Sequence, residues 1–318
     1  MQATVIIATY NRAELLTETL LDLARQRMMG DDEFEVIVAD NASTDDTRKI
    51  VEDMIRSFPV SLRYLHEPAQ GKSYALNHAI AQARGDVIVF TDDDTKLPAN
   101  WVAQYLTSFR ETEADGIGGP VRLLWLKPRP AWLTERLAKQ MGVVDYRDER
   151  FTVEDKRYCF IGPNCAYRAS LYRELGGYMP GESSEDVEFF LHAFRAGKKL
   201  VWEPAVAVGH KVQESQMTRD YLKRRFFRQG RGNASGSQEN FKGPALCRIP
   251  LWVIKQYLLM PFQALGCLLR GDREEARWIL LNRYLYAGFI YFCFQDWRHR
   301  RPLKRTRPEV FKSAGVRP

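Results

Sequence analysis

Residues 3–121 alternate between short apolar runs and longer segments whose apolar residues recur at helical spacing. Such an alternation is typical of a parallel, doubly wound sheet with helices on both faces. We therefore predict an α/β domain. The predicted strands are Ala3–Thr9, Glu35–Ala39, Val60–Leu65 and Val87–Thr91, and the predicted helices are Glu14–Arg27, Thr44–Phe58 (capped by Ser43 and Thr44) and Ser73–Arg84.

Three consecutive carboxylates, Asp92, Asp93 and Asp94, follow directly on the apolar run Val87–Thr91. Adjacent anions repel one another, and each costs free energy to remove from water. Oxygen ligands at the end of a strand suit a hard divalent ion, Mg²⁺ or Mn²⁺, that is held partly by substrate phosphates. Taken alone, the triplet fits a solvated acidic turn equally well.

Polar residues also follow two other predicted strands, at Thr9–Arg12 and Asp40–Ser43. Ligands of doubly wound sheets bind beyond the carboxyl ends of the strands, so the three clusters are predicted to face one site. Gly71–Ser73 looks like the end of a phosphate loop, but His66 occupies the position of the first glycine. No Gly-x-Gly-x-x-Gly follows the first strand. A nucleoside triphosphatase and a dinucleotide-binding enzyme are therefore disfavoured.

Residues 122–215 have a less regular pattern, in which glycine marks the ends of several predicted elements. Ser183–Asp186 is expected to open a helix. The predicted elements are a strand at Arg157–Phe160, a turn at Ile161–Asn164, helices at Ser170–Leu175 and Val187–Ala196, and a strand at Val201–Val208.

The net charge of +7 is concentrated at one end, because residues 295–318 alone carry +6. Nucleic-acid binding would require basic residues spread over a folded face, so we expect no nucleic-acid partner. The five cysteines form no Cys-x-x-Cys pair, which favours free thiols in a reducing compartment. A strand-like N-terminus without a basic leader predicts a cytosolic catalytic domain.

The order of these motifs resembles that of the inverting family 2 glycosyltransferases, which have the GT-A nucleotide-sugar-binding fold. The resemblance covers residues 3–212 and implies a nucleoside-diphosphate sugar donor with Mn²⁺ or Mg²⁺ as cofactor. The motifs are specific only in their combined order and spacing. They are Ile7–Arg12, Val38–Asp45, Gly71–Ser73 with Asn77, Gly85-Asp86 before Asp92–Asp94, Gly176–Tyr178 with Ser184–Asp186, and Pro204 followed by His210.

The resemblance implies roles for individual residues at the donor site. Tyr10 matches a position that stacks on the nucleotide base, and Asp40 matches one that accepts from the base or the ribose. Asp94 matches the direct metal ligand of an Asp-x-Asp pair, with His210 completing the metal shell. The predicted nucleotide-sugar site comprises Thr9, Tyr10, Arg12, Asp40, Lys72, Asn77, Asp92 and Asp93, and the predicted metal site comprises Asp92, Asp94 and His210.

Asp186 and Glu185 are the predicted catalytic residues. The acceptor hydroxyl must lose its proton during transfer, and a carboxylate on the face of the sugar opposite the leaving group can accept it. Asp186 is the predicted base because the first turn of a helix favours the anionic form of a carboxylate. Glu185 is expected to contact the acceptor or to order the loop. The alternative for Asp186 is a capping box with Ser183.

The predicted donor-site residues also have ordinary structural interpretations. Asp40 fits a helix-entry residue, Tyr10 a core aromatic residue, Lys72 a solvated loop cation and His210 a satisfied strand-end histidine. Asn41-Ala42 stands where the family often has Asp-Gly, so the identity of the base stays open.

The C-terminal part contains aromatic and apolar segments interrupted by charges. Residues 218–232 predict a basic aromatic helix that either lies on an anionic surface or packs with a solvated face. Ile249–Leu269 and Trp278–Phe294 carry Lys255 and Arg283, so we expect helices in the membrane interface rather than comfortable spans. The alternatives are two buried helices or a contact between copies in a homo-oligomer.

These observations together predict three regions. Residues 1–215 form a catalytic domain, with a nucleotide-sugar-binding half (1–121) and an acceptor half (122–215). Residues 216–243 form the basic helix and a linker, and residues 244–318 form an amphipathic helical, membrane-associated region with a basic tail. Asp220 stands where processive members of the resembled family have Trp, which favours one sugar per encounter.

We therefore expect a glycosyltransferase at the cytoplasmic face of the inner membrane, with a glycan or lipid-linked acceptor. Two other functions remain as alternatives. One is a non-catalytic nucleotide-sugar-binding subunit of a membrane assembly, against which the combined presence of Asp94 and Asp186 argues. The other is a nucleotidyltransferase, which would need a Gly-rich basic loop that Tyr10–Ala13 does not supply.

Overall fold

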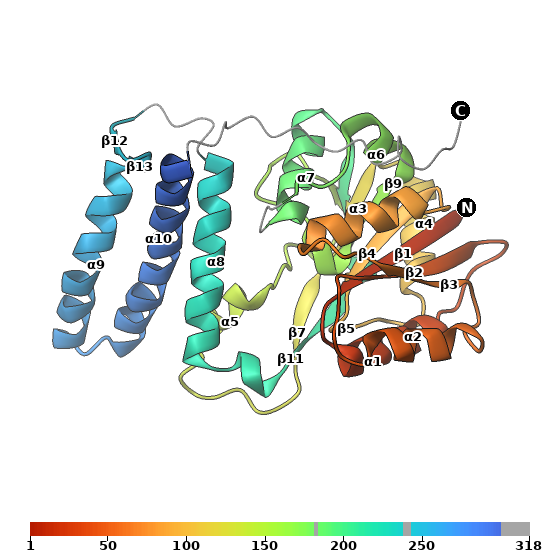
Figure 1. Ribbon diagram of the computed structural model, residues 1–318, viewed down its shortest axis with the longest axis horizontal. Coiled ribbons are helices and arrows are strands. Elements are labelled where there is room, and N and C mark those ends of the chain that lie inside the picture. Colours follow the sequence, from red (N-terminus) through yellow and green to blue (C-terminus); the bar gives the residue numbers. More distant parts are fainter. Residues whose placement is uncertain (181–183, 238–242, 300–318) are drawn as a thin grey trace.

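The computed structural model describes residues 1–180, 184–237 and 243–299. A domain built around a large sheet forms one side of the molecule, and a layer of three long helices forms the other (Figure 1). The large sheet has the strand order β3-β2-β1-β4-β9-β6-β10-β8. Its strands are β1 Gln2–Thr9, β2 Glu33–Asp40, β3 Leu62–His66, β4 Val87–Asp92, β6 Gly116–Gly118, β8 Phe151–Thr152, β9 Cys165–Arg168 and β10 Leu200–Trp202.

The first four strands pair in parallel, which confirms the predicted doubly wound half. Strand β9 then runs antiparallel to both β4 and β6, and β8 runs antiparallel to β10. Thr9 on β1 is the register partner of Asp40 on β2, and Ala8 is the partner of Asp92 on β4. The three predicted polar clusters therefore lie side by side at one edge of the sheet.

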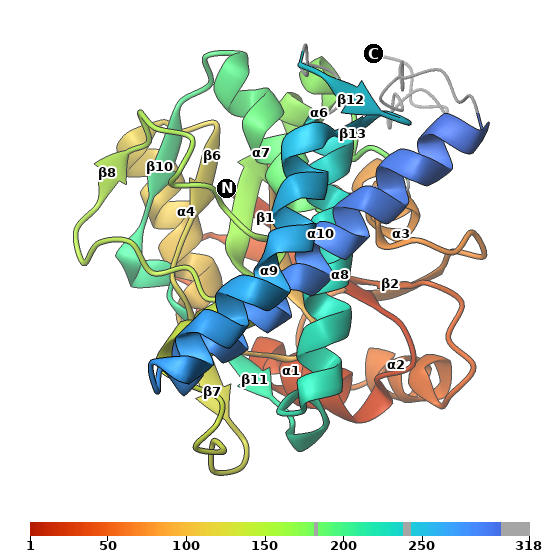
Figure 2. The ribbon, with the colours of Figure 1, turned by 90° about the vertical axis from the view of Figure 1, so that its left-hand side faces the viewer.

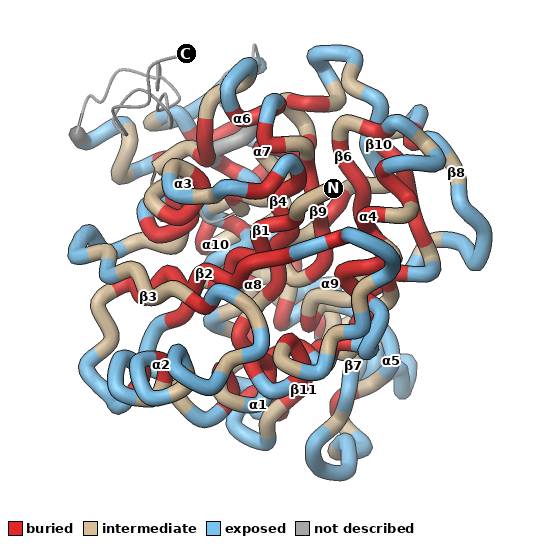
Figure 3. The backbone as a smooth tube through the Cα atoms, turned by 90° about the vertical axis from the view of Figure 1, so that its right-hand side faces the viewer, coloured by how far each residue is buried: buried red, intermediate tan, exposed pale blue. Residues whose placement is uncertain are grey.

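Helices cover both faces of the sheet, because alternate strand residues point to opposite sides. Val5 and Ile7 of β1 join the core beneath α1, α2 and α4, whereas Ile6 joins the core beneath α3, α6 and α7. The central strands β1, β2 and β4 are mostly buried, whereas β3 and β8 at the two edges of the sheet are more accessible (Figure 3). The helices are α1 Ala13–Ala24, α2 Thr47–Ile55, α3 Lys72–Gln82, α4 Trp101–Thr112, α6 Ala169–Leu175 and α7 Glu185–Arg195.

A second, three-stranded sheet has the order β5-β11-β7, with β5 Thr95–Lys96, β7 Val121–Trp125 and β11 Val208–Val212. His210 on β11 is the register partner of Thr95 on β5. Because Thr95 directly follows the carboxylate triplet, this small sheet carries His210 to the end of β4.

Several predicted elements were wrong in position or type. Residues Arg157–Phe160 form a turn and an irregular segment, and the strand in this region is β9. The strand predicted at Val201–Val208 is split into β10, a 3₁₀ turn at Pro204–Val206 and β11, because proline interrupts the ladder. Neither Ser43 nor Thr44 caps α2. Instead, the Asp45 carboxylate accepts from the Thr47 main chain at 3.1 Å.

The three long helices are α8 Arg219–Ser237, α9 Leu251–Leu269 and α10 Arg273–His299, and α10 lies between the other two (Figure 1). A Cβ atom at Gly230 of α8 would collide with the main-chain oxygen of Leu285, and one at Gly288 of α10 would collide with that of Phe227. Glycine on both helices thus allows their backbones to touch.

The remaining elements connect this layer to the domain or extend it. Helix α8 continues through residue 237, so residues 233–237 are helical rather than part of the predicted linker, and 238–242 lie outside the described residues. Helix α9 is long and apolar enough to cross a membrane by length and composition alone, although a core helix can pass the same test. The other short elements are α5 Glu135–Ala138, 3₁₀ turns at Lys139–Met141, Gly162–Asn164 and Glu214–Gln216, and strands β12 Ala245–Leu246 and β13 Ile249–Pro250.

Candidate active site

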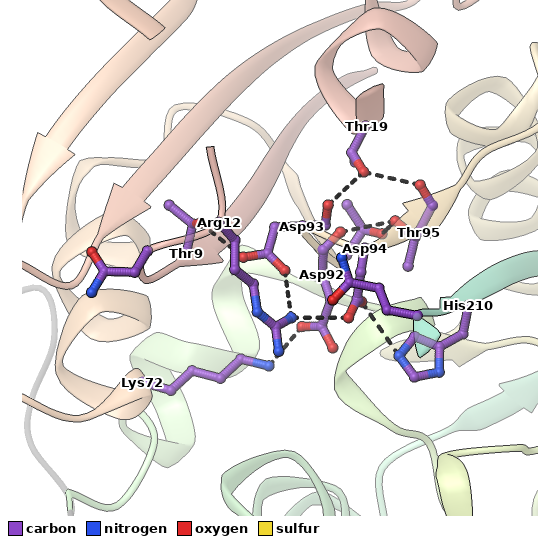
Figure 4. A network of polar contacts seen from close by, with 12 residues as sticks. Thr9, Arg12, Thr19, Lys72, Asp92, Asp93, Asp94, Thr95 and His210 are labelled. Atoms are coloured by element: carbon purple, nitrogen blue, oxygen red, sulfur yellow. Dashed lines mark hydrogen bonds and ion pairs between the residues drawn. The ribbon is translucent and has the colours of Figure 1, made fainter. Parts of the chain in front are cut away.

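The carboxylate triplet at the end of β4 is paired with two cations that come from other parts of the chain (Figure 4). Asp92 Oδ1 lies 2.7 Å from Lys72 Nζ, at the start of α3. Arg12 Nη1, in the turn after β1, lies 2.9 Å from both an Asp93 and an Asp94 oxygen. The triplet is therefore a charge-paired cluster and not a solvated acidic turn.

Asp93 is the member of the triplet that bonds to both Arg12 and Thr9. It is buried, and the Thr9 hydroxyl donates to its Oδ2 at 2.8 Å. Burial raises the pKa of Asp93 to about 6, although the adjacent Arg12 charge acts in the opposite direction. Thr9 and Asp93 bond to each other, and their predicted contact with the nucleotide sugar stays a prediction.

Asp94 and His210 provide groups that suit a divalent ion. Asp94 Oδ1 is buried without a hydrogen-bond donor, and His210 Nε2 lies 3.4 Å from it. Burial would raise the pKa of Asp94, but the contact with His210 and the charge of Arg12 outweigh this effect and lower it. An anionic carboxylate with an unused oxygen beside an imidazole fits Mg²⁺ or Mn²⁺.

The predicted three-residue metal shell is not formed. Among the described residues, no three His, Cys, Asp or Glu side chains gather closely enough to hold a metal ion by themselves. Asp92 is paired with Lys72, whereas Asp94 and His210 lie close enough together to offer two ligands to an ion. Mg²⁺ is commonly held by one or two carboxylates together with substrate phosphates and water, so two protein ligands are compatible with such a site.

Lys72 connects the carboxylate triplet to the second predicted centre. Its Nζ lies 2.7 Å from Asp92 and 3.8 Å from Glu185 Oε1, at the first position of α7. Burial alone would lower the pKa of Lys72, but the two carboxylates raise it, so the ammonium form persists. Burial raises the pKa of Glu185 to about 7. Lys72 is thus an integral part of the cluster and not a solvated loop cation.

Asp186 lies at the same edge of the sheet. Its Oδ2 accepts from the Gly162 main chain at 2.6 Å, and its Oδ1 accepts from the Val187 main chain at 2.8 Å. A Cβ atom placed on Gly162 would lie 3.4 Å from both Asp186 Oδ2 and Lys72 Nζ. Two segments far apart in the sequence therefore converge around Lys72. Ser183, the alternative capping partner, lies outside the described residues.

Tyr10 and Asp40, two further predicted donor-site residues, differ in how far their side chains are exposed. Tyr10 is 49% exposed, which excludes the core aromatic interpretation and leaves its ring free to stack. Asp40 is buried and accepts from the Tyr64 hydroxyl at 2.6 Å and from the Ser43 main chain at 2.9 Å. Asp40 therefore orders the turn after β2, whereas helix α2 begins only at Thr47.

Asn77 has a structural role that the prediction did not include. Its side-chain nitrogen donates to the Tyr178 carbonyl at 2.8 Å, and its side-chain oxygen accepts from the Tyr178 N–H at 2.8 Å. This reciprocal pair fastens α3 to the segment that leads into α7. Asn77 thus links α3 to this segment, and its contact with the nucleotide stays a prediction.

Asn164 supports the site and was read from the sequence only as part of a turn. Its buried amide makes four hydrogen bonds, at 2.8–3.0 Å, so every position of the side chain that usually bonds is satisfied. Gly162, which holds Asp186, lies in the same 3₁₀ turn. In the sequence, only Gly162 and Pro163 indicated a turn at this position. The partners of Asn164 are Trp101, Tyr105, Pro120 and Val206.

Arg225 of α8 is the residue through which the layer of long helices approaches His210. A Cβ atom placed on Gly142 would lie 3.3 Å from Arg225 Nη2 and 3.9 Å from His210 Cε1. Arg225 also donates to the Gln140 carbonyl. The sequence predicts only a basic helix in this region. The approach of α8 to His210 depends on tertiary packing and has no local sequence signal.

Known proteins resemble this chain in sequence. The sequence model of glycosyl transferase family 2 matches residues 4–176. The chain is 29% identical over 232 residues to the succinoglycan biosynthesis protein ExoM of Rhizobium meliloti, a match that covers 70% of this chain and 71% of ExoM. It is 28% identical over 202 residues to the poly(ribitol-phosphate) beta-N-acetylglucosaminyltransferase TarS of Staphylococcus aureus. That match covers 63% of this chain and 34% of TarS.

The fold is also shared with solved structures. The mannosyltransferase PcManGT of Pyrobaculum calidifontis, solved in complex with GDP-Man and Mn²⁺, superposes with a TM-score of 0.64 at 21% identity. The superposition covers 92% of this chain and 87% of PcManGT. At this level of identity the likeness shows the fold alone, and it confirms the GT-A fold predicted from the motifs.

Proposed function

Because the chain belongs to glycosyl transferase family 2 and is therefore a glycosyltransferase, we propose that it transfers a sugar from a nucleoside-diphosphate sugar to an acceptor hydroxyl with inversion. The observation that carries this proposal is the convergence of two groups of carboxylates on Lys72. Asp92 lies 2.7 Å and Glu185 3.8 Å from this cation, and Asp186 and Lys72 both approach Gly162. The cluster thus combines a site for a cation-bound diphosphate with a site for a general base.

The reaction exchanges one bond at the anomeric carbon for another. The bond to the diphosphate oxygen breaks and its electron pair leaves with the nucleotide, while the acceptor oxygen bonds from the opposite face. The acceptor proton moves to Asp186, which two main-chain N–H groups hold in a fixed orientation. Each carboxylate oxygen retains a second lone pair for this proton.

Asp94 and His210 are the residues that would hold the divalent ion, and Arg12 lies against Asp94. When bound, a divalent ion supplies positive charge to the leaving diphosphate as a Lewis acid. Arg12 and Lys72 add cationic groups near the same edge, where they offset the triplet and can meet phosphate or base. Tyr10, with its exposed ring, is the residue proposed to stack on the base.

We further propose that the acceptor is a lipid-linked or envelope-polysaccharide hydroxyl and that the enzyme works at the cytoplasmic face of the inner membrane. Two findings support this assignment. ExoM is described as a succinoglycan biosynthesis protein and TarS as acting on poly(ribitol-phosphate). In addition, helix α9 exposes much of its apolar surface. Asp220 in place of Trp favours one sugar per encounter.

A panel of nucleoside-diphosphate sugars tests the proposal. The full chain is mixed with each donor, with and without Mn²⁺, and both thermal stabilisation and release of free nucleoside diphosphate are measured. We expect one donor to stabilise the protein in the presence of Mn²⁺ and to be turned over when an acceptor extract is added. Stabilisation by a donor without any turnover would favour the alternative, a nucleotide-sugar-binding subunit. Equal turnover after complete chelation of divalent ions would contradict the metal site.

A further inference from the structure

Among the described residues, the charged side chains that line a groove between α8, α9 and α10 are all cations. It has a volume of about 690 Å³, and no carboxylate occurs among the described residues that line it. We name it the cationic groove. Its charged residues are Arg219 and Lys223 from α8 and Arg273, Arg277 and Arg283 from α10.

The positive charge of the cationic groove is only partly compensated. Lys223 pairs with Asp220 at 2.8 Å, but the Asp220 side chain is 73% exposed at the rim. The Arg283 guanidinium stacks 4.3 Å above the Tyr257 ring, and its Nε is buried without a hydrogen-bond acceptor. A buried donor of this kind is costly unless an acceptor approaches it. Several cations thus face one space whose described lining holds no carboxylate, and they are complementary to an anion such as a phosphate.

Apolar side chains form the rest of the groove and continue outside it. Leu268 of α9 and Leu280 and Leu281 of α10 line the walls. On the outer side of α9, Phe262 is 73% exposed and Leu269 is 81% exposed. Helix α9 is the outermost helix, farthest from the sheet, and it crosses in front of α10 in Figure 2. Only 22% of its most apolar 18-residue stretch is buried.

We propose that the cationic groove binds the phosphate headgroup of an anionic phospholipid while the outer side of α9 contacts the acyl region of the same leaflet. Charge complementarity argues for the anionic headgroup, and the adjoining exposed apolar side chains argue for an amphiphile over a free anion. This inference rests on the membrane association proposed above and names the lipid chemistry that would bring it about. It does not depend on which sugar is transferred.

Vesicle flotation with the full chain tests the inference. Vesicles of phosphatidylcholine alone are compared with vesicles that also contain phosphatidylglycerol, at low and high salt. The wild type should float with the anionic vesicles, and added salt should weaken this binding. The test variant combines Lys223→Gln, Arg273→Gln and Arg283→Gln. Each cation near an anionic leaflet strengthens binding by roughly fivefold, so the variant should bind about a hundredfold more weakly.

Two further variants separate the groove from net charge and from folding. Arg25→Gln, Lys49→Gln and Arg56→Gln remove the same charge from exposed positions of the sheet domain, and this control should bind within about twofold of wild type. Lys223→Arg, Arg273→Lys and Arg283→Lys keep the charge and should retain binding. Thermal melts establish that all three variants are folded.

Other outcomes would overturn the inference. Equal binding to neutral and anionic vesicles would show that the groove does not recognise an anionic lipid. An equal loss of vesicle binding in the control variant would show the same. If inorganic phosphate stabilised the wild type but not the test variant, and no vesicles were bound, the groove would be a free-phosphate site. Flotation without sugar transfer would contradict the proposed function and leave the lipid site intact, so the two failures are distinguishable.

Discussion

Lys72 Nζ lies 2.7 Å from Asp92 Oδ1, and this contact joins the first residue of α3 to the end of β4. Lys72 also lies 3.8 Å from Glu185, so one cation links the donor half of the site to the start of α7. Without a positive charge at this position, Asp92 at the end of β4 and Glu185 at the start of α7 would lose the cation that they share. Lys72 is therefore as important to the arrangement of the site as the carboxylates are.

Lys72→Met should impair both stability and donor binding. The change leaves Asp92 and Glu185 without their shared cation, and an incoming diphosphate then meets uncompensated negative charge. Because the Lys72 side chain is 39% exposed, we expect a loss of about 1–2 kcal/mol in the free energy of unfolding. Donor affinity, measured by calorimetry with Mn²⁺, should fall by roughly tenfold. The exposed Lys49→Met on α2 is the control, and equal effects in both variants would contradict this role.

Asn164→Ala should destabilise the whole domain. The substitution leaves two buried donors and two buried carbonyls without their amide partner. We expect the free energy of unfolding in urea to fall by about 3–5 kcal/mol. Asn100→Ala provides the control, because Asn100 is exposed and its side chain does not cap α4. A loss below about 1 kcal/mol would show that water replaces the amide.

Gly230→Ala and Gly288→Ala should each separate α8 from α10. The added methyl group would collide with a main-chain carbonyl of the facing helix, and backbone cannot move aside as a side chain can. We expect losses of about 2–3 kcal/mol in the free energy of unfolding. Gly266→Ala in α9 is the matched control, since its nearest neighbour is the end of Arg270 at 3.7 Å. This control should be neutral or should stabilise the helix by about 0.5–1 kcal/mol.

Asp32 should contribute stability that depends on pH. Hydrogen bonds from Arg110, at 2.7 and 2.8 Å, lower the pKa of Asp32 below its ordinary value of 3.8. The contribution is therefore fully present above about pH 4 and is lost as the pH falls through the lower pKa of the folded state. Asp32→Asn should lower the melting temperature at pH 7, and the difference from wild type should shrink below pH 3. A constant difference at all pH values would contradict the ion pair.

Local patterns predicted much of the first half of the fold. Val5, Ile6 and Ile7 alternate between two cores, and such a buried strand followed by an amphipathic helix is legible without tertiary information. The antiparallel strand β9 was not predicted, because its four residues form hydrogen bonds only with β4 and β6, which are distant in the sequence. The division of Val201–Val208 could have been anticipated from Pro204.

The candidate site was predictable to a different extent. The strand ends carrying Asp40 and Asp92 follow from the topology of a doubly wound sheet. The proximity of Asp186 was inferred from the family motif alone, because no local pattern relates α7 to β4. Asn164 and Arg225 act through contacts with residues that are distant in the sequence. Their residue types gave no sign of these contacts.

We propose that Asp186 accepts the acceptor proton beside a separate donor site. The direct test is Asp186→Asn, with the exposed Asp53→Asn as the control, assayed for donor binding by calorimetry and for sugar transfer by product formation. Donor affinity should stay within about twofold of wild type, whereas transfer should fall by about 10²–10⁴-fold. An Asp186→Asn enzyme that binds donor normally and transfers sugar at a rate near that of wild type would contradict the account.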